Sequence, residues 1–154
     1  HLASLWYQPL AQKASLEPEL HGSLNALRQG GLKLAIISNT FIPEHCHEEQ
    51  LDQLGLRDYF DLRLYSSSVI LQKPDRRIYR MALEILNVSP RETVMVGDKF
   101  RYDIMGPRRL GIQTVFKVNS LNAHKVRALP AEVPTINTIA ELPALLSSGP
   151  VSRG

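Results

Sequence analysis

The sequence predicts an α/β fold in which helices cover both faces of a doubly wound parallel sheet. Short apolar runs alternate with helix-like stretches from residue 32 to residue 146, and this alternation is typical of strand–helix–strand units. The best-defined runs are apolar at nearly every position, as expected for strands buried on both faces of a parallel sheet. Right-handed crossover connections would join successive strands.

The first part of the chain supplies a helix, a strand and a second helix. Leucines recur at helical spacing within residues 19–29 and a glycine pair follows, so this stretch is predicted to be an amphipathic helix. The almost wholly apolar run 32–37 is predicted to be a strand buried on both faces. A proline then starts a polar helix over residues 43–54, which a glycine closes.

The second part of the chain continues the alternation. Four further strands are predicted, over residues 61–65, 93–96, 113–116 and 135–137. The helices between and after them are predicted to start near Pro74, at Asp103 as N-cap and at Thr138. The apolar face of the first of these helices is predicted to consist of Ile78, Ala82, Ile85 and Leu86.

Composition excludes several classes of protein. Lysine and arginine number 18 against 15 acids, and the net charge of +3 is scattered, which argues against a nucleic-acid partner. Cys46 is the one cysteine, so no internal disulfide forms and a reducing compartment is expected. No apolar run approaches the roughly 20 residues that cross a bilayer. We expect a cytoplasmic protein without a membrane partner, and no pattern indicates an oligomeric state.

Polar side chains able to bind phosphate or metal ions follow three of the predicted strands. Ser38 and Asn39 follow the first, Lys73 lies in the loop after the second, and Asp98 and Asp103 follow the third. Parallel strands present their carboxyl ends at one edge of the sheet, so these side chains are predicted to converge there. Hydroxyl and amide groups bind phosphate oxygens, lysine neutralises them, and paired carboxylates hold Mg²⁺. This set is typical of phosphoryl transfer.

Each of these residues also has a purely structural interpretation. Ser38 and Asp98 can simply end strands, Lys73 can be solvated, and Asp103 can cap the following helix. Their joint occurrence at successive strand ends favours the functional interpretation.

In these motifs the sequence resembles the haloacid dehalogenase-like hydrolases. Ser38 looks like the family's second motif, Lys73 with Pro74 like its third, and residues 96–103, VGDKFRYD, like its fourth. The similarity extends over about residues 18–146, including the stretches YFD at 59–61, GPRRLGIQTVF at 106–116 and INTIAELPALL at 136–146.

The resemblance implies a Mg²⁺-dependent hydrolase, most often a phosphatase, which acts on a small phosphorylated metabolite through an aspartyl-phosphate. By position, Ser38 would bind the phosphoryl group, Asn39 would flank it and Lys73 would neutralise its charge. Asp98 would ligate Mg²⁺, and Asp103 would support the metal or Lys73.

One departure from the family is serious. Its first motif, DxDxT, supplies the nucleophile and the acid–base aspartate, yet no two aspartates of this sequence are separated by one residue. We therefore expect an N-terminally truncated core, inactive by itself, with residues 1–18 as a cap remnant or N-terminal extension, 19–147 as the core and 148–154 as a flexible tail. The missing strand would leave the middle of the sheet empty or filled by another segment, for example residues 2–7. The alternative is a non-catalytic domain with a binding or regulatory role.

Residues 45–47, His-Cys-His, are a second candidate metal site, for zinc. Imidazole and thiolate are good zinc ligands, but consecutive helical residues point about 100° apart, and no second ligand pair accompanies them. A solvated helix face is the favoured interpretation.

Overall fold

A computed structural model describes residues 16–148 of the chain. The chain divides into two compact units, with the boundary between Gln72 and Lys73. In both units helices alternate with strands, and every strand pair is parallel. The predicted α/β class with parallel strands is confirmed, whereas the predicted domain boundaries 1–18, 19–147 and 148–154 remain a prediction.

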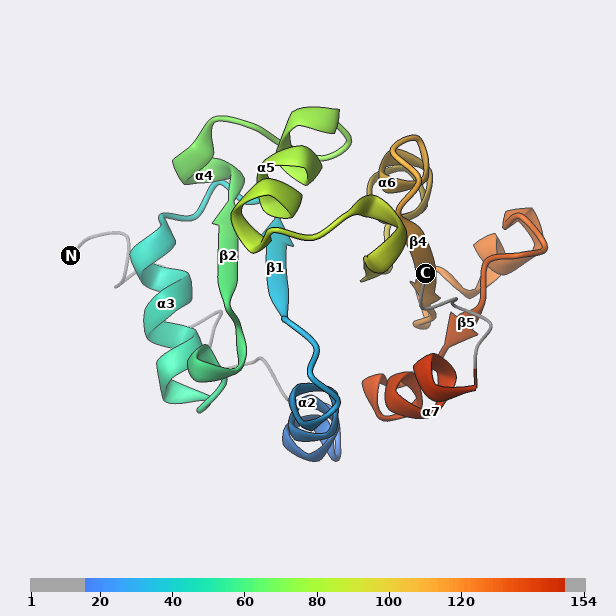
Figure 1. Ribbon diagram of the computed structural model, residues 1–154, viewed down its shortest axis with the longest axis horizontal. Helices are drawn as coiled ribbons and strands as arrows, with labels where there is room; N and C mark the ends of the chain where they lie inside the picture. The colour runs from blue at the N-terminus through green and yellow to red at the C-terminus, as the bar shows by residue number, and fades with distance from the viewer. Residues whose placement is uncertain (1–15, 149–154) are drawn as a thin grey trace. The chain divides into compact units, whose positions relative to one another are not determined.

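The first unit is built on a two-stranded sheet (Figure 1). Strands β1 and β2 are in register from Ala35 opposite Leu62 to Ser38 opposite Tyr65. Its elements are α2 (Leu20–Gln29), β1 (Ala35–Ser38), α3 (Glu44–Gln53), the 3₁₀ turn η1 (Arg57–Tyr59), β2 (Leu62–Tyr65) and α4 (Ser66–Val69).

The strand predicted over residues 32–37 is shorter and lies later than expected. Before Ala35, two hydrogen bonds between Asp61 and Leu34 take the place of regular strand pairing. The carboxylate of Asp61 accepts the N–H of Leu34 at 2.8 Å, and the N–H of Asp61 donates to the carbonyl of Leu34 at 2.8 Å. Arg28 of α2 pairs with the same carboxylate at 2.5 Å. The hydrogen bond from Arg28 keeps the pKa of Asp61 below its usual value.

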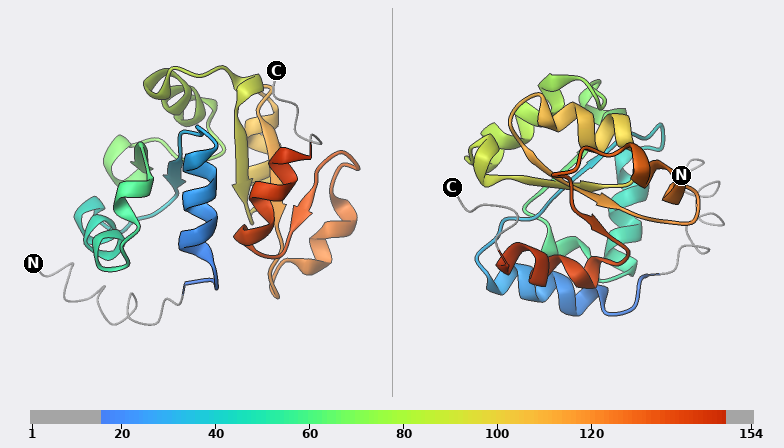
Figure 2. Two further views of the ribbon diagram at one scale, coloured as in Figure 1. Left: turned by 60° about the horizontal axis from the view of Figure 1, so that its bottom comes forward. Right: turned by 90° about the vertical axis from the view of Figure 1, so that its right-hand side faces the viewer.

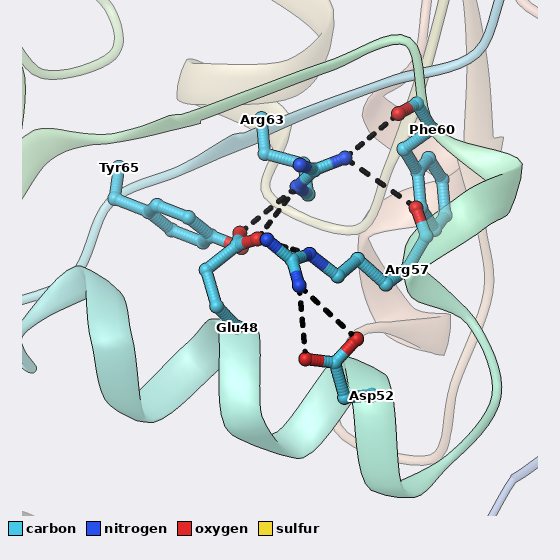
Figure 3. Close-up of polar contacts among 6 residues, drawn as sticks. All are labelled: Glu48, Asp52, Arg57, Phe60, Arg63 and Tyr65. Atoms are coloured by element: carbon cyan, nitrogen blue, oxygen red, sulfur yellow. Dashed lines mark hydrogen bonds and ion pairs between the residues drawn. The ribbon is translucent and has the colours of Figure 1, made fainter.

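A polar network ties α3 to β2 and η1 (Figure 3). The carboxylate of Glu48 in α3 accepts hydrogen bonds from Arg63 Nε and Tyr65 O–H, both at 2.9 Å, and pairs with Arg57 Nε at 3.1 Å. Arg57 also pairs with Asp52 at 3.1 Å. Burial opposes ionisation of Glu48, but the hydrogen bonds from Tyr65 and Arg63 outweigh it and lower the pKa of the carboxyl.

The second unit contains three strands that lie side by side (Figure 2). Strand β4 pairs with β3 on one side and with β5 on the other. Its elements are α5 (Arg76–Leu86), η2 (Pro90–Glu92), β3 (Val94–Gly97), the π-helix η3 (Phe100–Met105), α6 (Gly106–Arg108), β4 (Gln113–Lys117), η4 (Ala123–Ala128), β5 (Thr135–Ile136), η5 (Ile139–Glu141) and α7 (Leu142–Ser147).

Helix α5 begins near Pro74 as predicted but differs on its apolar face. Its N-cap is Asp75, whose carboxylate accepts the N–H of Arg77 at 2.9 Å. Ile85 is 57% exposed, and the buried residues on the helix are Ile78, Tyr79, Ala82 and Leu83. The buried stripe is rotated because it includes the aromatic ring of Tyr79, which a polar assignment of tyrosine overlooks.

The strands predicted to be buried on both faces are only half-buried when they form an edge. Strand β1 is half-buried or exposed along its length, and β3 is half-buried throughout. By contrast, three central residues of β4, which has a neighbour on each side, are buried. Within residues 16–148 the five strands form two sheets, one of β1 and β2 and one of β3, β4 and β5. The segment 2–7, suggested as a filler of the missing strand position, lies outside the described residues.

No helix within the described residues is long and apolar enough to cross a membrane.

We expect Glu48→Gln to lower the free energy of unfolding by about 2 kcal/mol near neutral pH, because an amide loses the charge-assisted hydrogen bonds. The pKa of Glu48 lies below its ordinary value of 4.5. Its contribution is therefore complete above that pH and is lost as the pH falls through the lowered pKa. Urea unfolding followed by circular dichroism, near neutral pH and at about pH 3, measures both effects. The matched control is Glu49→Gln at the exposed next residue; an equal loss in both variants would contradict the assignment.

Candidate functional site

The most strongly buried charges among the predicted site residues belong to Lys73 and Asp103. Lys73 Nζ lies 2.6 Å from Asp103 Oδ1, and the two side chains are 11% and 4% exposed. The alternative of a solvated Lys73 is therefore wrong. A buried carboxylate is tolerated only with a partner, so each of these charges depends on the other.

Asp103 also accepts a backbone hydrogen bond at the start of η3. Its Oδ2 accepts the backbone N–H of Lys99 at 2.9 Å. Lys99, and not Asp103, precedes the first residue of η3, and the carboxylate reaches back to it from within the helix. The predicted N-cap position is thus wrong. Pro107 lies in α6, which continues from η3, at a point where its missing N–H is tolerated.

A glycine permits the approach of Asp103 to the end of β3. A Cβ placed on Gly97 would lie 2.5 Å from the side-chain atoms of Asp103. Any larger residue at this position would displace the carboxylate, so the glycine before Asp98 is required by the packing of the site.

Helix α5 supports the same loop through Tyr79. The fully buried phenol donates a hydrogen bond to the carbonyl of Tyr102, at 2.5 Å. Burial raises the pKa of Tyr79, and the negative charge of Asp103 raises it further. The phenol is therefore a hydrogen-bond donor near neutral pH and links α5 to η3.

Asp98 is more exposed than Asp103 and accepts hydrogen bonds from two asparagines that were not predicted from the sequence. Asn119 Nδ2 donates to Asp98 Oδ2 at 3.1 Å, and Lys99 Nζ lies 3.5 Å from the same oxygen. The buried Asn122 donates from Nδ2 to the carbonyls of Asp98 and Lys117, at 3.2 and 2.9 Å. The signal that would have found them is the polar loop after β4, which follows the next strand of the same sheet.

The carboxylates of Asp98 and Asp103 could supply only some of the ligands of a metal ion, so further ligands would have to come from other groups. Both oxygens of Asp103 are hydrogen-bonded, to Lys73 and Lys99, and Oδ2 of Asp98 is held by Asn119. Within residues 16–148 no group of three or more His, Cys, Asp or Glu side chains is arranged to hold a metal ion. Since Mg²⁺ takes about six oxygen ligands, these carboxylates would contribute only part of a coordination shell.

Ser38 and Asn39 lie in the other unit, at the carboxyl end of β1. Ser38 is half-buried as the last residue of the strand, and Asn39 is exposed in the turn that leads to α3. The structure therefore brings together Lys73, Asp98 and Asp103 within one unit. The predicted convergence of Ser38 and Asn39 with them remains a prediction.

Residues 45–47 do not form a uniformly solvated face. Cys46 is buried, with its Sγ 3.4 Å from Nε2 of His45, and the ring of His47 stacks on Tyr65 with centroids 4.9 Å apart. Burial lowers the pKa of His47, although the charge of Glu48 opposes the shift. His45 and Cys46 thus contact each other, whereas His47 packs against Tyr65 of β2.

This chain is similar in sequence to proteins of a known family. A family model described as haloacid dehalogenase-like hydrolase matches residues 2–117. The chain is 37% identical over 115 residues to the phosphoserine phosphatase of Thermus thermophilus, covering 75% of this chain and 45% of that protein. It is 38% identical over 126 residues to the pyrimidine 5′-nucleotidase YjjG of Escherichia coli, covering 80% and 53%.

A solved structure gives the same answer for the fold. The HAD phosphatase of Thermococcus onnurineus matches with a TM-score of 0.77 at 28% identity, covering 96% of this chain and 66% of that one. The chain spans about half the length of the two curated relatives.

We expect Asp103→Asn to lower the free energy of unfolding by about 3 kcal/mol, because Lys73 would keep a buried charge without its counter-charge. Asp98→Asn, the same change in the same loop, should cost less than about 1 kcal/mol, since that carboxylate is 36% exposed. Urea unfolding of both variants gives the comparison. Equal losses of unfolding free energy in the two variants would show that the buried ion pair does not stabilise the fold more than the exposed carboxylate does.

Proposed function

Because the chain belongs to the haloacid dehalogenase-like hydrolases, we propose that it supplies the phosphate-binding and metal-binding residues of a phosphatase. The observation that carries the proposal is the buried Lys73–Asp103 ion pair beside Asp98, just beyond the carboxyl end of β3. Ligands of parallel α/β sheets bind at this end of the strands.

The proposed roles follow from the chemistry of each side chain. Lys73 neutralises the developing charge on the phosphoryl oxygens, and Asp103 holds the lysine in place through the 2.6 Å contact. The hydroxyl of Ser38 donates a hydrogen bond to the phosphoryl group, and Asn39 flanks it. Asp98 is a ligand of Mg²⁺, which when bound shields the negative charges of the phosphate and the carboxylates.

We propose that the nucleophile of the reaction is an aspartate outside these 154 residues. Reaction through an aspartyl-phosphate requires a carboxylate in line with the phosphorus atom, and the sequence has no pair of aspartates at the DxDxT spacing. Among residues 16–148, β1 and β3 each pair with one neighbouring strand. The other edge of each backbone ladder could pair with a further strand, which supports the same proposal. The chain by itself is then inactive by this route.

The substrate class is a small phosphorylated compound. The matched relatives are named as phosphatases or nucleotidases acting on different compounds, so no particular metabolite is proposed. A cytoplasmic location is part of the proposal, supported by the single cysteine of the sequence, Cys46.

A non-catalytic domain that binds phosphorylated ligands is the second candidate. The absence of the DxDxT spacing from the sequence favours it. Both candidates use Ser38 and Lys73 for binding, and they differ in whether a phosphoester bond is broken.

The test begins with the native protein, captured with an antibody against this chain, and measures its intact mass and its turnover of p-nitrophenyl phosphate with Mg²⁺. We expect turnover, and we expect Lys73→Met in that protein to reduce kcat at least about 100-fold, because a transition-state charge loses its partner. Lys125→Met, at an exposed lysine of η4, is the matched control. The melting temperature of each variant separates lost chemistry from lost structure.

The recombinant 154-residue chain is assayed in parallel and is expected to be inactive. Metal-dependent turnover by this chain, abolished by mutating an aspartate other than Asp98 or Asp103, would overturn the assignment of the nucleophile. A native protein that binds orthophosphate but lacks turnover with phosphate esters would establish the non-catalytic candidate instead.

A further inference from the structure

The turn after β1, residues 39–42, is held by a side chain from α4. The N–H of Thr40 donates to Ser66 Oγ at 2.9 Å, and the Ser66 hydroxyl donates to the carbonyl of Thr40, also at 2.9 Å. One hydroxyl thus satisfies both backbone groups of a single turn residue. A hydroxyl can do this because it is both a donor and an acceptor.

This contact extends the pairing of β1 and β2 beyond the end of the sheet. The backbone register ends at Ser38 opposite Tyr65, because the chain leaves the strand and enters α4 at Ser66. The side chain of Ser66 then takes the place of the next rung of the ladder. The position of the turn relative to β2 is therefore fixed by two hydrogen bonds rather than by the backbone alone.

Three further contacts restrain the same turn. Thr40 Oγ1 accepts the N–H of Ile42 at 3.0 Å and lies 2.9 Å from Nε2 of His47. Ser67 donates its hydroxyl to the carbonyl of Ile42 at 2.8 Å. The turn is thus anchored on α4 at two residues and on α3 at one.

The groups that anchor the turn are themselves fixed. The ring of His47 stacks on Tyr65 at an interplanar angle of 9°. The phenol of Tyr65 donates to Glu48, which Arg63 holds from β2 (Figure 3). The restraint on the turn therefore continues into the ion-paired framework of the first unit.

We propose that Ser66 is a positioning residue for phosphate binding, which aims Ser38 and Asn39 by fixing the backbone of Thr40. The proposal rests on the proposed function of Ser38 as a phosphate ligand. Donors that are held in place before the anion arrives need not be ordered during binding, so affinity is gained without a direct contact. Ser66 contacts Thr40 and acts on the ligand only through this turn.

The chain offers matched variants of this residue. Ser66→Ala removes the hydroxyl, and Ser66→Thr retains it. Ser68→Ala makes the same deletion two residues further along α4, at an exposed side chain for which the described part of the chain provides no hydrogen-bond partner. A general effect of serine deletion in α4 would appear in both alanine variants.

The experiment uses the 154-residue chain and its three variants, labelled for NMR. Amide hydrogen exchange of Thr40 is measured first, and inorganic phosphate is then titrated while the amide signals of Ser38 and Asn39 are followed. We expect Ser66→Ala to accelerate exchange of Thr40 and to weaken phosphate binding, each by about tenfold, the effect of losing a net hydrogen bond. Ser66→Thr and Ser68→Ala should match the unmodified chain.

Each other outcome overturns a defined part of the proposal. If phosphate shifts the signals of Ser38 and Asn39 with equal affinity in Ser66→Ala, the positioning role is wrong while the assignment of Ser38 stands. Unchanged exchange of Thr40 in Ser66→Ala would show that the hydroxyl does not hold the turn. If phosphate leaves Ser38 and Asn39 unaffected in the unmodified chain, their assignment as phosphate ligands fails and the positioning role falls with it.

Discussion

The buried ion pair of Lys73 and Asp103 is the constraint on which the candidate site depends. A carboxylate with almost no exposure to water requires partners for its oxygens, and Asp103 obtains them from Lys73 and from the backbone of Lys99. To reach both, its side chain passes so close to the end of β3 that residue 97 must be glycine. The course of the Asp98 loop thus follows from the need to satisfy one charge.

The same pair links the stability of the second unit to its proposed chemistry. Lys73 is held in place by Asp103 at 2.6 Å, so in the proposed mechanism its positive charge is preorganised for a phosphate. Removal of either residue leaves the other buried without its opposite charge. A loss of activity on mutation of this pair therefore needs a parallel measurement of stability before it is assigned to chemistry.

Side-chain hydrogen bonds continue the sheets where the backbone ladders end. Ser66 bridges to the turn after β1, and Asn122 bridges the loops after β3 and β4. These residues bring no charge and would not be selected as catalytic groups. They fix the backbone of the turns that carry the candidate site residues. Strands of four or five residues can therefore be followed by well-defined loops.

The sequence alone determined the alternation of strands and helices and the family, because apolar periodicity and motif spacing are local properties of the chain. It also selected Lys73, Asp98 and Asp103 before their proximity was known. Only the tertiary structure decided that Lys73 is buried against Asp103, that Tyr79 belongs to the core, and that β1 has no fully buried residue. Burial and pairing depend on which distant segments become neighbours, and the order of residues along the chain does not contain that information explicitly.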